Sequence, residues 1–267
     1  MNAKRCVAAA QTVPVRGDVA ANVREHLRLA ELASGERVEA LVFPELSLTG
    51  YEIELADGLA FSKRDSRLGP LVDAAASCAL TLVVGAPIRI ESKLHIGAFV
   101  IRRDRSIDVY TKRRLGAFSA AAGCDGVVPP AERTVFQSGD LDPIVEIGET
   151  RAAIAVCADI GDPAHPRAAA ARGATIYLAG MFIIPAEFES DATRLAAYAS
   201  EHSMAVIMAN YGAPTGGLAT AGKSAAWSEN GELLAQLGPA GTGVVIATKL
   251  EAGWHARTVT LDERRQT

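Results

Sequence analysis

Short apolar runs alternate with helical patterns along most of the chain, and this alternation limits the possible fold more than any other feature of the sequence. The expected strands are residues 6–10, 40–43, 81–85, 94–102, 107–110, 144–147, 152–156, 175–179 and 205–209. The expected helices are residues 18–35, 68–79, 166–172 and 189–202, the first of them with Asp18 as its N-cap and Gly35 at its end. Strands mixed with helices in this way predict a layered α/β domain.

The size and composition of the chain fit one domain that spans residues 1–267. Hydrophobic residues make up 49% of the chain and aromatic residues only 5%, so we expect a core built from small aliphatic side chains. The net charge of -4 indicates no basic surface for nucleic acid or for an anionic membrane. We therefore expect a small-molecule substrate and neither a nucleic-acid nor a membrane partner.

The four cysteines are scattered, without the paired spacing of a disulfide framework or of a metal site. We therefore expect no metal and no other cofactor, and a location in the reducing cytoplasm. No apolar stretch approaches the length of a membrane span, and the one near the N-terminus is too short for a signal peptide.

Three short motifs bring an acid, a cation and a thiol into one chain: F-P-E-L around Glu45, Y-T-K-R-R-L around Lys112 and V-C-A-D around Cys157. Each residue alone has a structural explanation, as a turn carboxylate, a solvated charge or a buried core thiol. Their positions favour function, because Glu45 and Cys157 both follow buried strands. In open α/β sheets, ligands bind beyond the carboxyl ends of the strands.

An acid, a cation and a thiol are the parts of an acyl-transfer site. A thiol attacks a carbonyl as its thiolate, so it needs a base that takes its proton. The tetrahedral oxyanion that follows needs a positive charge or well-aimed N–H donors. Glu45 suits the first role, Lys112 the second, and Cys157 is the nucleophile.

The three motifs, in this order, resemble those of the carbon-nitrogen hydrolase (nitrilase) superfamily. The resemblance extends to A-A-Q at residues 9–11 and to E-N-G-E-L-L at residues 229–234. It implies a four-layer αββα sandwich that stacks into homodimers or larger homo-oligomers. It also implies a catalytic triad of Glu45, Lys112 and Cys157, with Glu132 as a second glutamate that holds the lysine.

The sequence departs from the family pattern directly after the nucleophile. Members of the superfamily commonly carry a large aromatic residue where this chain has Ala158, so we expect a differently shaped pocket. The backbone N–H of Ala158 is expected to help stabilise the oxyanion. The other expected pocket walls are Tyr51, just after Glu45, and Phe182, beyond the strand at residues 175–179.

True nitrilases of the superfamily usually read Cys-Trp-Glu at this point, so the resemblance, with Cys-Ala-Asp in this chain, implies hydrolysis of a small amide through a cysteine thioester. Two alternatives stay open within the same fold. One is an enzyme that hydrolyses an N-carbamoyl compound or a nitrile. The other is a protein that binds a small molecule without turning it over.

Residues 217–224 also match the P-loop pattern G-x-x-x-x-G-K-[ST] in full. A P-loop runs from a strand straight into a helix, but here a turn signal at residues 229–231 follows too soon for one. We interpret the segment as the lead-in to a β-hairpin and not as an NTPase site. A partial match to G-x-S-x-G at residues 222–226 lacks the following helix for the same reason.

Two further residues are weighed for a role. Cys124 is a second thiol in a glycine-rich loop, but no strand end projects it into a site. His165 follows Cys157 closely enough in the sequence to be examined as the partner of a Cys-His pair.

Overall fold

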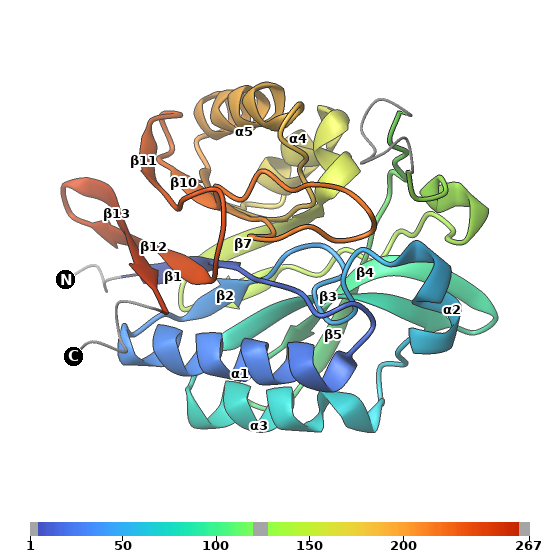
Figure 1. Cartoon of the computed structure of the whole chain (residues 1–267). Helices are drawn as coiled ribbons and strands as arrows, with labels where there is room; N and C mark the ends of the chain where they lie inside the picture. Colours follow the sequence, from blue (N-terminus) through green and yellow to red (C-terminus); the bar gives the residue numbers. More distant parts are fainter. Residues whose placement is uncertain (1–4, 120–127, 262–267) are drawn as a thin grey trace.

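Two β-sheets form the centre of the molecule (Figure 1). The computed structural model describes residues 5–119 and 128–261, and the elements below are those of these residues. The seven-stranded sheet has the order β13 (Gly253–Thr260), β12 (Gly243–Leu250), β1 (Arg5–Gln11), β2 (Ala40–Val42), β3 (Thr81–Ile90), β4 (Lys93–Ile101) and β5 (Ile107–Thr111). The six-stranded sheet has the order β11 (Leu233–Gln236), β10 (Ala225–Trp227), β9 (Ala205–Ala209), β8 (Ile176–Gly180), β7 (Thr150–Val156) and β6 (Val145–Ile147).

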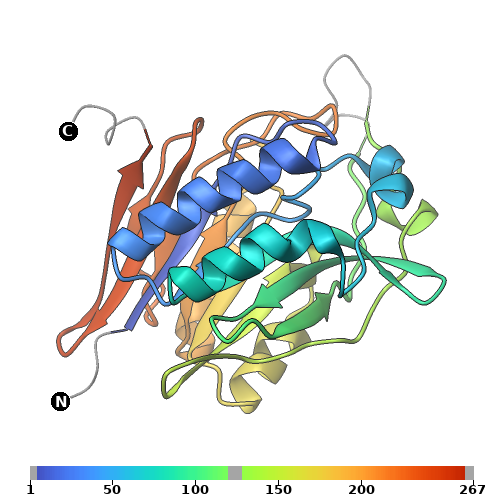
Figure 2. The ribbon, with the colours of Figure 1, turned by 90° about the horizontal axis from the view of Figure 1, so that it is seen from below.

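Helices cover the outer face of each sheet. Figure 2 shows α1 (Val19–Gly35) and α3 (Gly69–Ser77) side by side across the seven-stranded sheet. On the other side of the molecule, α4 (Ala164–Ala171) and α5 (Phe188–His202) cover the six-stranded sheet (Figure 1). The shorter helical segments are α2 (Ala56–Leu59) and the 3-10 turns η1 (Ile53–Leu55), η2 (Ser66–Leu68), η4 (Glu132–Thr134) and η5 (Cys157–Gly161).

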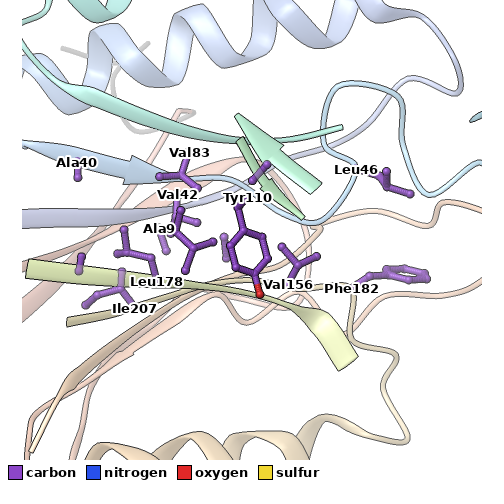
Figure 3. Packing of buried hydrophobic residues seen from close by; sticks show 14 of the residues in the cluster. Ala9, Ala40, Val42, Leu46, Val83, Tyr110, Val156, Leu178, Phe182 and Ile207 are labelled. Atoms are coloured by element: carbon purple, nitrogen blue, oxygen red, sulfur yellow. The ribbon is translucent and has the colours of Figure 1, made fainter. Parts of the chain in front are cut away.

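Three separate hydrophobic clusters lie between these layers. Successive side chains of a strand point to opposite faces, so β1 places Val7 and Ala9 between the sheets and Ala8 and Ala10 against the helices. Figure 3 shows the cluster between the sheets, which includes Leu178 and other branched aliphatic side chains. A third cluster joins the six-stranded sheet to α4 and α5. The layer order is therefore α, β, β, α, which confirms the expected sandwich.

The parallel strands place their carboxyl ends together at one edge. Strands β1, β2 and β3 run parallel in one sheet, and β7, β8 and β9 run parallel in the other. The backbone N–H of Glu45, just after β2, donates to the carbonyl of Met181, just after β8, at 3.4 Å. The strand ends of the two sheets therefore meet, and candidate residues from both sheets converge there.

One strand is longer than the sequence indicated. We expected a strand to end at Gly85, but β3 continues through Pro87 to Ile90 because it pairs antiparallel with β4 along that length. The glycine has a structural reason: a Cβ at Gly85 would lie 2.3 Å from the carbonyl oxygen of Pro44. The absence of a side chain therefore lets the loop that carries Glu45 lie directly on β3.

Other expected elements agree closely with the structure. The predicted hairpin is present as β4 and β5, and Asp18 caps α1 by accepting a hydrogen bond from the N–H of Ala21. Strands β12 and β13 were not predicted, and they extend the first sheet beyond β1. That all 267 residues form one domain stays a prediction.

The P-loop match lacks the helix that phosphate binding needs. Ser224 runs directly into β10, which forms an antiparallel hairpin with β11. The Ser224 hydroxyl is buried and accepts a hydrogen bond from the N–H of Asn210 at 2.9 Å. Lys223 lies over the ring of Phe188 and faces Glu189. The segment is the lead-in to a β-hairpin, as interpreted from the sequence.

Candidate active site

The ends of three strands bring Glu45, Lys112 and Cys157 together. Glu45 follows β2, Lys112 follows β5 directly, and Cys157 follows β7 directly. The ammonium of Lys112 donates to Oε1 of Glu45 at 2.6 Å. The Lys112 side chain has no solvent exposure, and neither does that of Glu45. One sheet therefore supplies the acid and the cation, and the other supplies the thiol.

Glu132, in η4, completes the surroundings of the lysine. Its oxygens accept hydrogen bonds from the Lys112 ammonium at 2.7 and 2.9 Å. Each oxygen also accepts from a second group, the Tyr51 hydroxyl at 2.8 Å and the N–H of Gly116 at 2.7 Å. This is where the sequence placed a supporting glutamate. Since all of these donors converge on one buried carboxylate, Glu132 fixes the lysine in place.

Cys157 begins η5 in an uncommon backbone conformation. Its φ of +43° lies in the left-handed region, which is costly for a residue other than glycine and is often found at functional sites. The thiol points toward the carbonyl of Phe182, with a sulfur to oxygen distance of 3.5 Å. Burial and the negative charge of Glu45 raise the pKa of the Cys157 thiol well above its usual value, although Lys112 opposes the shift. The resting form is therefore the thiol.

Glu45 is the candidate base for that thiol, because its carboxylate interacts with the Cys157 side chain. Burial raises its pKa to about 7; the charge of Lys112 works against this rise, and that of Glu132 adds to it. Its Oε2 atom is buried and has no hydrogen-bond partner of ordinary geometry among the described residues, and the nearby Cys157 thiol interacts with the same carboxylate and lowers its pKa. One oxygen is thus bonded to the lysine, and the other is free to receive a proton.

Lys112 stays protonated in this site. Burial alone would lower its pKa, but the negative charges of Glu45 and Glu132 outweigh that effect and hold the pKa above its ordinary value. A permanent positive charge beside the candidate nucleophile, Cys157, is what the stabilisation of an oxyanion would need.

A cavity of about 320 Å³ opens onto Cys157. Tyr51 and Ala158 line it, as the sequence predicted, and Phe118 and Arg114 line it as well. Phe182 was predicted as a pocket wall, but it is not among the lining residues. Its ring packs against Tyr51, with 4.4 Å between the ring centres, because Phe182 belongs to the hydrophobic cluster between the sheets.

Two further residues were considered from the sequence, His165 and Cys124, and neither is found among the described residues of the site. His165 is bonded to the hydroxyl groups of Tyr110 and Tyr177, at 2.9 and 2.7 Å, and is not a partner of Cys157. Burial lowers the pKa of His165, which favours the neutral ring. Cys124 lies outside the described residues.

Asp159, the last residue of the V-C-A-D motif, has a structural role that the sequence did not indicate. Its Oδ1 atom accepts hydrogen bonds from the N–H groups of Arg113 and Arg114, at 2.9 and 2.8 Å. Its Oδ2 atom accepts from the Tyr110 hydroxyl at 2.6 Å and from the N–H of Val156 at 3.1 Å. Asp159 therefore ties the end of β5, which carries the lysine, to the turn that carries the nucleophile.

No group of three or more His, Cys, Asp or Glu side chains in residues 5–119 and 128–261 is arranged to hold a metal ion. Across the same residues, no helix has the length and apolar character needed to span a membrane.

Comparison with known proteins shows the family to which the chain belongs. The model of the carbon-nitrogen hydrolase family matches residues 6–249, and the chain belongs to that family. Among curated proteins, the glutamine-dependent NAD(+) synthetase of Mycobacterium tuberculosis is 32% identical over 238 residues. That of Mycobacterium leprae is 31% identical over 244 residues. Each match covers 82% of this chain but only 35% of the relative, so the chain spans about a third of the length of these proteins.

Solved structures share the fold. A variant of the amidase from Nesterenkonia sp. AN1, with the acetamide moiety of fluoroacetamide added covalently at its active-site cysteine, aligns with a TM-score of 0.80 at 24% identity. The alignment covers 93% of this chain and 91% of the amidase. Another variant of that amidase, in complex with butyramide, aligns with a TM-score of 0.78. At this level of identity the likeness shows the fold, the nitrilase-type sandwich.

Proposed function

We propose that the chain hydrolyses a small carboxylic amide to the acid and ammonia through a thioester on Cys157. The observation that carries this proposal is the free Oε2 atom of Glu45, a buried carboxylate with a pKa of about 7 in the same site as a protonated thiol. A base with a pKa near neutrality can both accept and return a proton.

In the first half of the proposed reaction, Glu45 takes the thiol proton and the sulfur attacks the amide carbonyl carbon. The oxyanion is stabilised by the Lys112 ammonium and by the N–H of Ala158. That N–H lies in the first turn of η5, where amide groups have no partner within the helix. Protonated Glu45 then gives its proton to the leaving nitrogen, and ammonia departs.

In the second half, Glu45 removes a proton from a water molecule that attacks the thioester carbonyl. The acid leaves, and the proton returns to the Cys157 sulfur. Glu132 keeps the Lys112 ammonium in place through both halves. No step requires a metal or an organic cofactor.

An amide is favoured over a nitrile or an N-carbamoyl compound by the names of the curated relatives. They are named for their dependence on glutamine, which carries a terminal carboxamide. Assembly into homodimers and a cytoplasmic location stay predictions from the sequence.

Release of ammonia from a panel of primary amides, N-carbamoyl compounds and nitriles tests the proposal. We expect turnover of one or more amides by the purified chain and none by the Cys157→Ala variant. Turnover restricted to nitriles or to carbamoyl compounds would assign the other branches of the family. A folded chain that binds amides without releasing ammonia would indicate a binding protein.

A further inference from the structure

Two arginines line the cavity that leads to Cys157, and they differ in their partners. Arg194 forms an ion pair with Asp191 at 2.5 Å. Arg114 has no carboxylate within 4.0 Å among the described residues. Its sequence neighbour Arg113 is bonded to Asp142 at 2.8 Å and does not line the cavity. Arg114 is thus the cation of this cavity that is available to a ligand.

Arg114, an exposed residue, also contacts the turn that carries Cys157. Its backbone N–H donates to Asp159 at 2.8 Å, and its guanidinium donates to the carbonyl of Gly161 at 3.3 Å. A guanidinium carries five N–H donors in a planar fork, so most of them stay uncommitted. Such a fork fits both oxygens of a carboxylate at once.

The charges around the cavity specify how a substrate that carries a carboxylate would be oriented. The inner end holds two acids, Glu45 and Glu132, around one lysine, and the side formed by α5 holds Glu187 and Asp191. Neither place favours an anion. A carboxylate is therefore best accommodated beside Arg114. An uncharged carboxamide suits the inner end better than an anion does, because Glu45 and Glu132 flank Lys112 there.

We propose that the substrate is an amide whose acyl chain ends in a carboxylate, and that Arg114 binds this carboxylate while the amide reaches Cys157. This inference rests on the proposed amidase function and adds its substrate class. A cavity of about 320 Å³ has room for such a small molecule.

The test compares two five-carbon amides that differ in one terminal group. Glutaramate, the monoamide of glutaric acid, carries the carboxylate, and pentanamide does not. A charge-assisted pair predicts a kcat/KM for glutaramate at least about tenfold above that for pentanamide. The Arg114→Ala variant should lose this preference, mainly through a rise in the KM for glutaramate. Arg114→Lys should keep part of it, since the charge remains.

Arg113→Ala is the matched control, because it removes a neighbouring arginine that does not line the cavity. It should leave the ratio between the two amides unchanged. The inference is overturned if wild-type protein uses pentanamide as efficiently as glutaramate, or if Arg114→Ala lowers turnover of both amides equally.

A binding measurement separates this inference from the proposed function. Calorimetry on the Cys157→Ala protein should show glutaramate binding that the additional Arg114→Ala change weakens by about tenfold or more. If neither amide is hydrolysed but this dependence is found, the amidase proposal fails and the carboxylate site stands. If Cys157→Ala protein binds neither amide, or binds both equally, the carboxylate site is ruled out.

Discussion

At the scale of single residues, Glu45 divides its two oxygens between different tasks. Oε1 is bonded to the Lys112 ammonium at 2.6 Å, and Oε2 is free within a buried pocket. Without the lysine, burial would favour the neutral acid even more strongly. In the proposed mechanism, the lysine therefore serves as a counter-charge for Glu45 and as a positive charge for the oxyanion.

Replacing that lysine should be costly. Lys112→Ala is expected to lower kcat by about a hundredfold or more, the scale seen when one oxyanion donor is lost. It also leaves two buried carboxylates unpaired, so we expect the free energy of unfolding to fall by about 3–5 kcal/mol. Steady-state kinetics and urea unfolding measure the two effects. Lys223→Ala, in the segment that matches the P-loop, is the control, and its turnover and stability should be near normal. Near-normal turnover in folded Lys112→Ala would remove Lys112 from the mechanism.

The pKa of Glu45 predicts the acidic limb of the pH profile. The base must be ionised, so kcat/KM should fall as the pH drops below about 7, by about tenfold per unit at the lower end. Glu132 contributes to raising the pKa of Glu45, and therefore Glu132→Gln should move this limb to lower pH. A profile that is flat between pH 5.5 and 8, or a limb that Glu132→Gln leaves in place, would argue against Glu45 as the base.

At the scale of elements, helix α1 holds the loop that carries Glu45. His26 of α1 is buried and stacks on Phe43 with 4.0 Å between the ring centres. Its Nδ1 is 2.7 Å from the carbonyl of Asn22, which places the proton there, so its Nε2 accepts from the Ser47 hydroxyl at 2.9 Å. A protonated ring could not accept this hydrogen bond, and burial lowers the pKa of His26 to about 4.

This histidine makes stability depend on pH. Its pKa is near 6.5 when unfolded and about 4 when folded, so its contribution is complete above pH 6.5 and is lost as the pH falls toward 4. Between pH 7 and pH 5, the free energy of unfolding should fall by about 2 kcal/mol more in wild-type protein than in His26→Gln. Urea unfolding at both values measures this. The exposed His255→Gln is the control, and equal slopes in all three proteins would contradict the assignment.

The elements also show what the sequence does and does not predict. Helical and strand periodicity located the βαβ units, and the motifs located Glu45, Lys112 and Cys157, because both signals are local. The pairing of β1 with β12 joins opposite ends of the chain, so no local pattern encodes it. Arg114 was missed for a similar reason, since an arginine beside two other basic residues has the appearance of a solvated charge until the cavity is seen.

At the scale of the whole molecule, the site exists only when the two sheets dock. Glu45 and Lys112 come from one sheet and Cys157 from the other, and the cluster of apolar side chains between the sheets sets their spacing. Leu178 belongs to that cluster, and Leu29 belongs to the cluster beneath α1. Both side chains are fully buried.

Variants of these two leucines distinguish the alignment of the catalytic side chains from the stability of the fold. Leu178→Ala and Leu29→Ala should each lower the free energy of unfolding by about 2–5 kcal/mol, because each leaves a cavity. Only Leu178→Ala should also lower kcat/KM, by about tenfold or more, since small misplacements of reacting groups are costly. Kinetics well below the unfolding temperature measures this, and equal losses of activity in both variants would contradict a role for sheet docking.

The central claim, a covalent acyl group on Cys157, is tested most directly by the intact mass of a trapped intermediate. Glu45→Gln should be nearly inactive toward amides, but an activated ester, whose leaving group needs no proton, should still acylate it. Because this variant lacks the base that activates water, the acyl group should persist. Mass spectrometry should find the added acyl mass, and peptide mapping should place it on Cys157. An adduct on another cysteine or on Ser224, or turnover that survives in Cys157→Ala, would contradict the mechanism.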